Sequence, residues 1–170
     1  MKAIIAPCHA YGDDVDTDRI IAGKYTKTLN PADLAARVLE DLDPDFRRRM
    51  QAGDILVGGE NFGCGSSREQ APLALQAAGV SAVVAASFAR IFYRNAINTG
   101  LPVFAVGPHR IRNGSRLHIC PERGEVRIPE DGITLSCRPL PPVMAAILTA
   151  GGLVPYMKQH GRYPAGENPQ

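Results

Sequence analysis

The residues best suited to chemistry lie together in one short stretch of the chain. Their order is Gly63-Cys64-Gly65-Ser66-Ser67-Arg68-Glu69. Glycines let a backbone turn sharply and approach a ligand closely, and an arginine can bind a carboxylate or phosphate through two parallel hydrogen bonds. The adjacent serines add hydroxyls that can donate and accept hydrogen bonds. The stretch therefore predicts an anion-binding site with a candidate acid/base hydroxyl.

Three common ligand-binding motifs do not fit this stretch. A phosphate-binding P-loop has a lysine after its last glycine, whereas Ser66 follows Gly65 here. The dinucleotide-binding fingerprint has a glycine or alanine at the position of Arg68. The nucleophile elbow of α/β-hydrolases has a glycine two residues after its serine, and neither Ser66 nor Ser67 has one there. These three classes of site are therefore excluded here.

A purely structural role for Ser66 is the alternative. Ser66 and Glu69 have the spacing of a capping box, in which the serine begins a helix. That start would place Pro72 inside the helix, where it removes an internal hydrogen bond. A helix that begins near Ala71 keeps Pro72 in its first turn and leaves Ser66 and Ser67 in a loop. We favour the second arrangement, in which the serines are available to a ligand.

The elements around the stretch alternate between strands and helices, which is typical of parallel crossover units. Apolar runs predict strands at residues 3–7, 55–57, 82–85 and 103–106. Apolar spacing with start and stop residues predicts helices at residues 31–41, 43–50, 71–78 and 87–99. The glycine-bearing stretch follows a parallel strand at its carboxyl end, where open α/β sheets bind ligands.

The flanking segments have a different pattern. Residues 10–30 are polar and are expected to form a loop. Short apolar runs between Gly and Pro predict an antiparallel section with strands at residues 117–120, 126–128 and 133–135. A last helix is expected at residues 142–150. The predicted fold class is therefore α/β, with a layered sheet, crossover helices and an antiparallel section.

Length and composition limit the possible classes of protein. The 170 residues predict about one domain, which we assign to residues 1–160, with a flexible tail at residues 161–170. A net charge of +2 is too small for a typical nucleic-acid-binding protein. No apolar run reaches the ~20 residues that a membrane span needs, and the N-terminal apolar run is too short for a secretory signal. We therefore expect a cytoplasmic protein that binds neither nucleic acid nor membrane.

The four cysteines do not have the spacing of a metal site. Cys8, Cys64, Cys120 and Cys137 are far apart and include no Cys-x-x-Cys pair. We expect reduced thiols, with Cys64 a small packed residue of the loop. We also expect no metal bound by this chain, so that any metal centre it works with takes its ligands from another chain.

Four ordered stretches carry a resemblance to a known family. They are residues 12–18 (Gly12-Asp13-Asp14-Val15-Asp16-Thr17-Asp18), residues 59–69 (the stretch above preceded by Gly59-Glu60-Asn61-Phe62), residues 87–98 (Ser87-Phe88-Ala89-Arg90-Ile91-Phe92-Tyr93-Arg94-Asn95-Ala96-Ile97-Asn98) and Gly100-Leu101-Pro102. Together they resemble the aconitase-type swivelling domain, and most closely the small subunits of 3-isopropylmalate dehydratase and homoaconitase. The similarity runs from about residue 2 to residue 155. It implies a swivelling β/β/α fold.

The resemblance implies a hydro-lyase site shared between two subunits. In the family, a large subunit carries a [4Fe-4S] cluster that binds a hydroxy di- or tricarboxylic acid, and the small subunit closes over it. By position, the catalytic base maps to Ser66, a hydrogen-bonding hydroxyl to Ser67 and the carboxylate-binding arginine to Arg68. Gly63 and Gly65 would shape the loop. Asp18 would orient an active-site partner in the family manner, with a local Asx turn as the alternative.

Two positions depart from the family pattern. Gln70 stands where relatives usually have histidine, and because an amide does not titrate we expect it to support the loop or interface. Lys27 stands at a position that varies with substrate in the family. A cation there could bind an extra carboxylate, whereas an apolar residue would favour an isopropyl group, and a solvent-facing lysine is the alternative. Arg90 and Arg94 lie one helical turn apart and could meet the large subunit or face solvent.

The resemblance implies the small subunit of a heteromeric dehydratase that isomerises 2- and 3-isopropylmalate in leucine biosynthesis and is inactive alone. The same chemistry on homoaconitate, citrate or a methylated malate such as dimethylmalate is a second interpretation. A non-catalytic anion-binding or regulatory module, with the loop kept as a capped turn, is a third.

Overall fold

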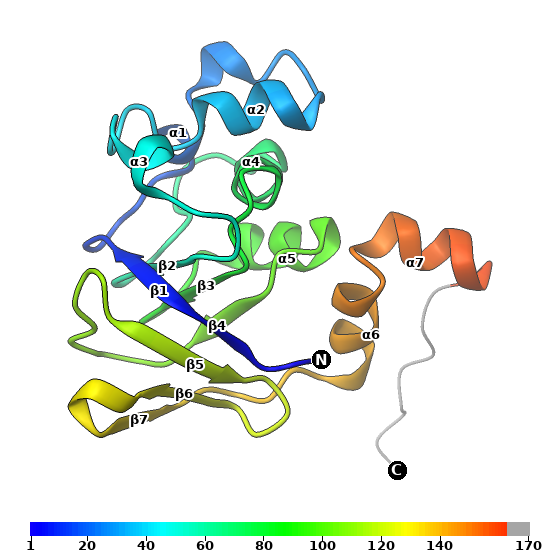
Figure 1. Ribbon diagram of the computed structural model, residues 1–170. Coiled ribbons are helices and arrows are strands. Elements are labelled where there is room, and N and C mark those ends of the chain that lie inside the picture. The colour runs from blue at the N-terminus through cyan, green and yellow to red at the C-terminus, as the bar shows by residue number, and fades with distance from the viewer. Residues whose placement is uncertain (163–170) are drawn as a thin grey trace.

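A seven-stranded sheet lies at the centre of the molecule, with the strand order β4-β3-β2-β1-β5-β6-β7 (Figure 1). The computed structural model describes residues 1–162. Strands β1 to β4 pair in parallel, and β1 and β5 to β7 pair antiparallel. The strands are β1 (Ile4–Ala10), β2 (Ile55–Gly58), β3 (Ala82–Ala85), β4 (Val103–Ala105), β5 (Arg116–Cys120), β6 (Glu125–Ile128) and β7 (Ile133–Ser136). The predicted α/β class and its antiparallel section are therefore confirmed.

Strand β1 joins the two parts of the sheet. Its first half, from Ile4 to Pro7, pairs with β5, and its second half, from Cys8 to Ala10, pairs with β2. Successive side chains of a strand point to opposite faces, and β2 buries both faces. Ile55 and Val57 pack in a core with the antiparallel strands, whereas Leu56 packs in a second core with the helices.

Two cores on either side of β2 and β3 produce three layers. Figure 1 shows α2, α4 and α5 on one side of the parallel strands and β5 to β7 on the other. This arrangement agrees with the layered β/β/α fold that the resemblance implies. The helices are α1 (Thr17–Ile20), α2 (Pro31–Arg37), α3 (Phe46–Arg49), α4 (Gln70–Ala77), α5 (Arg90–Thr99), α6 (Pro142–Thr149) and α7 (Leu153–His160). Two single 3-10 turns are η1 (Gly23–Tyr25) and η2 (Pro129–Asp131).

The helix predicted at residues 31–41 is shorter than expected. It ends at Arg37, because Val38 is extended and Leu39 adopts a φ of +58°. The Leu39 N–H donates to the carbonyl of Ile20 at 2.8 Å, so the turn has a long-range partner. Val38 and Leu39 are buried, as their apolar spacing predicts, but a turn and not a helix places them in the core.

Three further element predictions need correction. The expected loop at residues 10–30 contains α1 and η1, and Asp16 begins α1 by accepting the N–H of Asp18. The helix predicted at residues 87–99 begins at Arg90, because the residues before it continue from β3 and pair with the β2 loop. The helix at residues 142–150 is not the last one, since a turn with two positive-φ glycines leads into α7.

The predicted tail at residues 161–170 begins at the end of α7. Gly161 caps that helix with a φ of +68°. Residues 163–170 lie outside the described residues. Among residues 1–162, no helix is long and apolar enough to cross a membrane.

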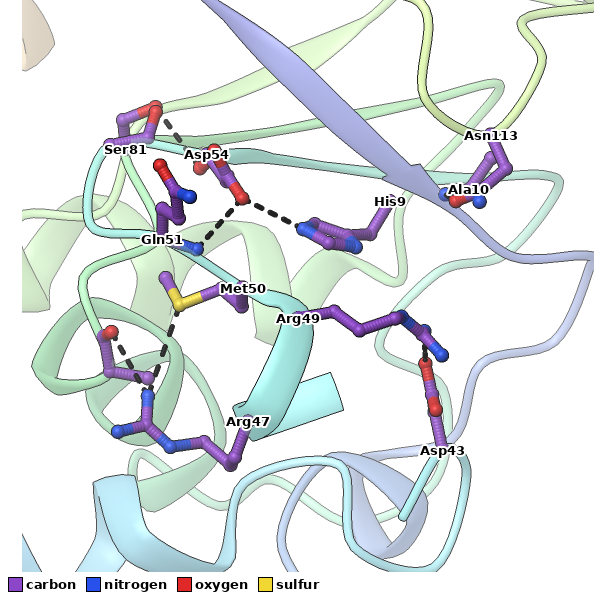
Figure 2. A network of polar contacts seen from close by, with 12 residues as sticks. His9, Ala10, Asp43, Arg47, Arg49, Met50, Gln51, Asp54, Ser81 and Asn113 are labelled. Atoms are coloured by element: carbon purple, nitrogen blue, oxygen red, sulfur yellow. Dashed lines mark hydrogen bonds and ion pairs between the residues drawn. The ribbon is translucent and has the colours of Figure 1, made fainter. Parts of the chain in front are cut away.

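A buried carboxylate ties the end of β1 to the start of β2 (Figure 2). Asp54 Oδ2 lies 2.8 Å from His9 Nε2 and accepts the N–H of Gln51 at 2.9 Å. The side chain of Ser81 donates to the carbonyl of Gly53, which brings the start of β3 to the same place. These contacts join the end of β1 to the starts of β2 and β3, and they fix the strands from which the site loops leave.

Candidate active site

Three loops that follow β1, β2 and β3 pair with one another beyond the sheet. Isolated parallel bridges join Asp16 to Cys64 and Phe62 to Phe88. The Gly63 N–H donates to the carbonyl of Val15 at 2.8 Å. The glycine-bearing stretch therefore lies in the middle, at the carboxyl ends of the parallel strands, as the sequence predicts.

Both glycines of this loop are required by its geometry. Gly63 has a φ of +79°, and a Cβ atom there would lie 2.1 Å from the Phe92 ring. Gly65 has a φ of +90°, and a Cβ atom there would lie 2.5 Å from the Asp16 carboxylate. A side chain at either position would therefore strain the backbone and displace a neighbouring loop or helix.

An aromatic cluster packs against the loop. The buried ring of Phe62 meets the rings of Phe88 and Phe92 edge to face, with centroids 5.9 and 5.3 Å apart. Edge-to-face contacts between aromatic rings are favourable, so the three rings keep a defined arrangement. The cluster therefore holds the β2 loop against α5.

Ser66 lies in the loop and does not begin a helix. Helix α4 begins at Gln70, its N-cap residue is Glu69, and no side chain caps it. The capping-box alternative is therefore wrong, and Pro72 falls in the first turn as expected. The Thr17 hydroxyl donates to the Ser66 carbonyl at 3.1 Å and lies 3.1 Å from Ser66 Oγ.

The contact with Thr17 orients the Ser66 hydroxyl. Because a hydroxyl has one proton, Thr17 accepts the proton of Ser66 when it donates its own to the Ser66 carbonyl. Thr17 is 1% exposed, so this hydrogen bond is shielded from water. The contact was not predicted, because nothing in the local spacing of residues 12–18 relates Thr17 to Ser66.

Ser66 opens onto a cavity of about 440 Å³. Gly63, Gly65 and Ser66 form one wall, and the start of α5, with Arg90 and Arg94, forms the other. A small organic acid fits a cavity of this size. The serine is therefore accessible to a ligand, whereas the Thr17 hydroxyl behind it is not.

Arg68 lies on the other side of the loop and does not line this cavity. Its Nη1 pairs with Asp18 Oδ1, and its guanidinium packs on Gly23. The Asp18 N–H donates to the Asp16 carboxylate, so the Asx turn here is formed by the Asp16 side chain and not by that of Asp18. The structure thus brings Arg68 and Asp18 together in an ion pair. Ser66 and Arg68 are close in sequence but line different sides of the loop.

The other predicted site residues lie in this loop or in the segments next to it. The side chain of Gln70 donates to the carbonyl of Thr26 at 3.4 Å, so it ties α4 to the segment that contains Lys27. The Lys27 side chain is exposed and makes no ion pair within residues 1–162. Ser67 is exposed, and its carbonyl accepts a hydrogen bond from Asn95 of α5 at 3.1 Å.

The loop backbone leaves donors available for an anion. Within residues 1–162, the amide N–H groups of Ser66, Ser67 and Arg68 donate to no protein acceptor. Neighbouring free amides in a turn can bind an anion. Asn95 was not singled out by the sequence, because a hydrogen bond between residues 28 positions apart leaves no local signal.

Cys64 is poorly suited to act as a nucleophile. Burial, followed by the carboxylates of Asp16 and Asp14, raises the pKa of its thiol above the usual value. The thiol therefore stays protonated at neutral pH, and the thiolate is the reactive form. This agrees with the prediction of a packed residue.

Metal ligands do not gather anywhere in the described part of the chain. In residues 1–162, no three His, Cys, Asp or Glu side chains are arranged to hold a metal ion. The four cysteines are free and separate, with Cys8 and Cys137 buried. An iron–sulfur cluster needs several thiolates at one place, so the residues present do not fit one held by this chain.

The fold and site together define a layered α/β domain with a serine- and arginine-bearing loop at the carboxyl ends of its parallel strands. The model of the aconitase C-terminal domain matches residues 8–105. The 3-isopropylmalate dehydratase small subunit of Moorella thermoacetica is 52% identical over 155 residues, covering 88% of this chain and 92% of the relative. The chain therefore belongs to the aconitase C-terminal domain family.

Two proteins of Methanocaldococcus jannaschii support the same assignment. The crystal structure of its 3-isopropylmalate dehydratase has a TM-score of 0.89 and 44% identity, covering 94% of this chain and 96% of that chain. Its isopropylmalate/citramalate isomerase small subunit is 48% identical over 151 residues, covering 88% of this chain and 90% of the relative. The fold that the resemblance implies is confirmed.

Replacing Gly63 by alanine should destabilise the protein more than the backbone conformation alone explains. Gly132 is the control, because it has a φ of +65° and an added Cβ would meet no atom within 4 Å. Gly132→Ala should cost about 1–2 kcal/mol, and Gly63→Ala should cost about 1–3 kcal/mol more, since it displaces the Phe92 ring. Urea unfolding measures both, and equal losses would contradict the tight loop packing.

Proposed function

We propose that this chain is the small subunit of a 3-isopropylmalate dehydratase, which interconverts 2- and 3-isopropylmalate by dehydration and rehydration in leucine biosynthesis. The 52% identity to a 3-isopropylmalate dehydratase small subunit supports the substrate and the subunit. The observation that carries the chemistry is the position of Ser66, held by a buried hydroxyl at the wall of an open cavity. A loop used merely as a capped turn would not leave this serine free.

The partner is a large subunit that carries a [4Fe-4S] cluster. The absence of a metal-ligand group in residues 1–162 and the small-subunit names of the relatives support this division. When bound, the cluster supplies a Lewis acid for the substrate hydroxyl and carboxylate. The four free thiols fit a reducing cytoplasm. We propose no nucleic-acid or membrane partner.

Ser66 acts as the base that removes a proton from the substrate carbon and returns it during rehydration. A serine is a weak base in water, so its deprotonated form needs stabilisation by nearby donors and positive charge. The free amides of the loop and the guanidinium groups beside the cavity supply both. The hydrogen bond to Thr17 keeps the hydroxyl in one orientation.

Arg68 binds a carboxylate of the substrate. Loss of a proton next to a carboxylate places negative charge on that group, and a fixed guanidinium stabilises it in the transition state. Asp18 pairs with Nη1 of Arg68 and so holds the guanidinium in place. Ser67 adds an exposed hydroxyl, and Gln70 supports the Lys27 segment.

A second candidate is the same reaction on a methylated malate. The relative from Methanocaldococcus jannaschii is an isopropylmalate/citramalate isomerase small subunit, so one site of this type accepts acids with different alkyl groups. Homoaconitate and citrate bring a third carboxylate instead. Lys27 is the residue that separates these substrates, because a cation favours a carboxylate and an alkyl group favours an apolar neighbour.

Ser66→Ala should abolish most of the dehydratase activity without affecting assembly. Loss of a general base lowers kcat by about 10²–10⁴. The chain is mixed with the cluster-loaded large subunit of a 3-isopropylmalate dehydratase, and kcat and the amount of complex are measured. Ser136→Ala, at an exposed position in β7, is the control. An unchanged kcat in Ser66→Ala would remove the base role, and no activity with the wild-type chain would contradict the proposed function.

Lys27→Leu should shift substrate preference away from tricarboxylates. Loss of one charged contact should lower kcat/KM for citrate relative to isopropylmalate by about tenfold. Steady-state rates on both acids measure the ratio, with Lys158→Leu on α7 as an exposed control. A ratio equal to that of the wild type would show that Lys27 faces solvent in the assembled enzyme.

A further inference from the structure

Two arginines on α5 line the same cavity as Ser66. Arg90 and Arg94 are four residues apart, so their side chains lie on one face of the helix. Both are exposed, and neither makes an ion pair with a residue of the described range 1–162. They also border a neighbouring hollow of about 330 Å³ beside Phe88 and Tyr93.

This pair carries an uncompensated positive charge. Like charges four residues apart on a helix repel each other, and a nearby carboxylate would relieve the repulsion. The acidic residues close to the cavity have other partners. Asp14 accepts a bond from Asn61, Glu60 accepts one from Ser87, and Asp16 caps α1. The two guanidinium groups are therefore left for an external anion.

We propose that Arg90 and Arg94 bind one carboxylate of the hydroxy acid substrate while Ser66 faces its reacting carbon, an inference that rests on the proposed function. The cavity of about 440 Å³ has room for a small dicarboxylic acid. Arg68 lies outside this cavity and is paired with Asp18, so it does not supply the positive charge on this side.

A carboxylate could reach this pair from the substrate or from an acidic side chain of the large subunit. The chemistry of recognition is the same, but the consequences differ. If the substrate supplies the carboxylate, loss of an arginine raises KM even when every small subunit is bound in the complex. If the large subunit supplies the carboxylate, loss of an arginine raises the concentration of large subunit that is needed to form the complex.

The test uses Arg90→Gln, Arg94→Gln and the double variant, each reconstituted with a cluster-loaded large subunit. Arg123→Gln is the control, because Arg123 is also exposed but lies in the turn between β5 and β6. We expect each single variant to raise KM for isopropylmalate about tenfold, as expected for a lost charged hydrogen bond. The kcat should fall as well, because the same guanidinium groups stabilise deprotonated Ser66, and Arg94→Lys should recover part of both losses. The subunit affinity, measured by titrating the large subunit without substrate, should match that of the wild type.

Two results would overturn the inference. One is an unchanged KM in the double variant at saturating large subunit. The other is weaker subunit association with an unchanged KM, which would assign the carboxylate to the partner. Circular dichroism of each variant checks that α5 is intact. Failure of the proposed function is distinguishable from both, since the wild-type chain would then give no activity with the large subunit.

Discussion

The pairing of three loops beyond the carboxyl ends of β1, β2 and β3 is the interaction on which the site depends. Parallel bridges extend the strand ladder past the sheet, through Asp16 with Cys64 and through Phe62 with Phe88. The loop is therefore positioned by backbone hydrogen bonds on both sides, and helix α4 starts after it. This explains why Gly63 and Gly65 are needed, since a side chain at either would enter the neighbouring loop or helix.

This arrangement places one hydroxyl between two positively charged regions. Thr17 holds Ser66 from behind, Arg68 lies on the side of Asp18, and Arg90 lies across the cavity. A proton taken from carbon next to a carboxylate leaves negative charge, which fixed donors stabilise without reorganisation. The small subunit thus contributes the base and the cations of the proposed reaction.

The sequence predicted the parallel strands well, because β2 and β3 are buried on both faces and form continuous apolar runs. It also located the loop, since the stretch with Ser66 and Arg68 follows a predicted parallel strand at its carboxyl end. The end of α2 and the Thr17–Ser66 contact depend on partners far along the chain, so local spacing carries no signal for them. The ordered motifs indicated the family, and the matches to the aconitase C-terminal domain and to the 52% identical relative confirmed it.

The buried hydroxyl of Thr17, from the β1 loop, holds the serine base in position. The most direct measurement is kcat of the reconstituted enzyme with Thr17→Val, which removes the hydroxyl but keeps the side-chain shape, beside Thr17→Ser, which retains the hydroxyl. We expect kcat to fall about tenfold in Thr17→Val and to stay near wild type in Thr17→Ser, with the complex formed normally. A wild-type kcat in Thr17→Val would contradict this account.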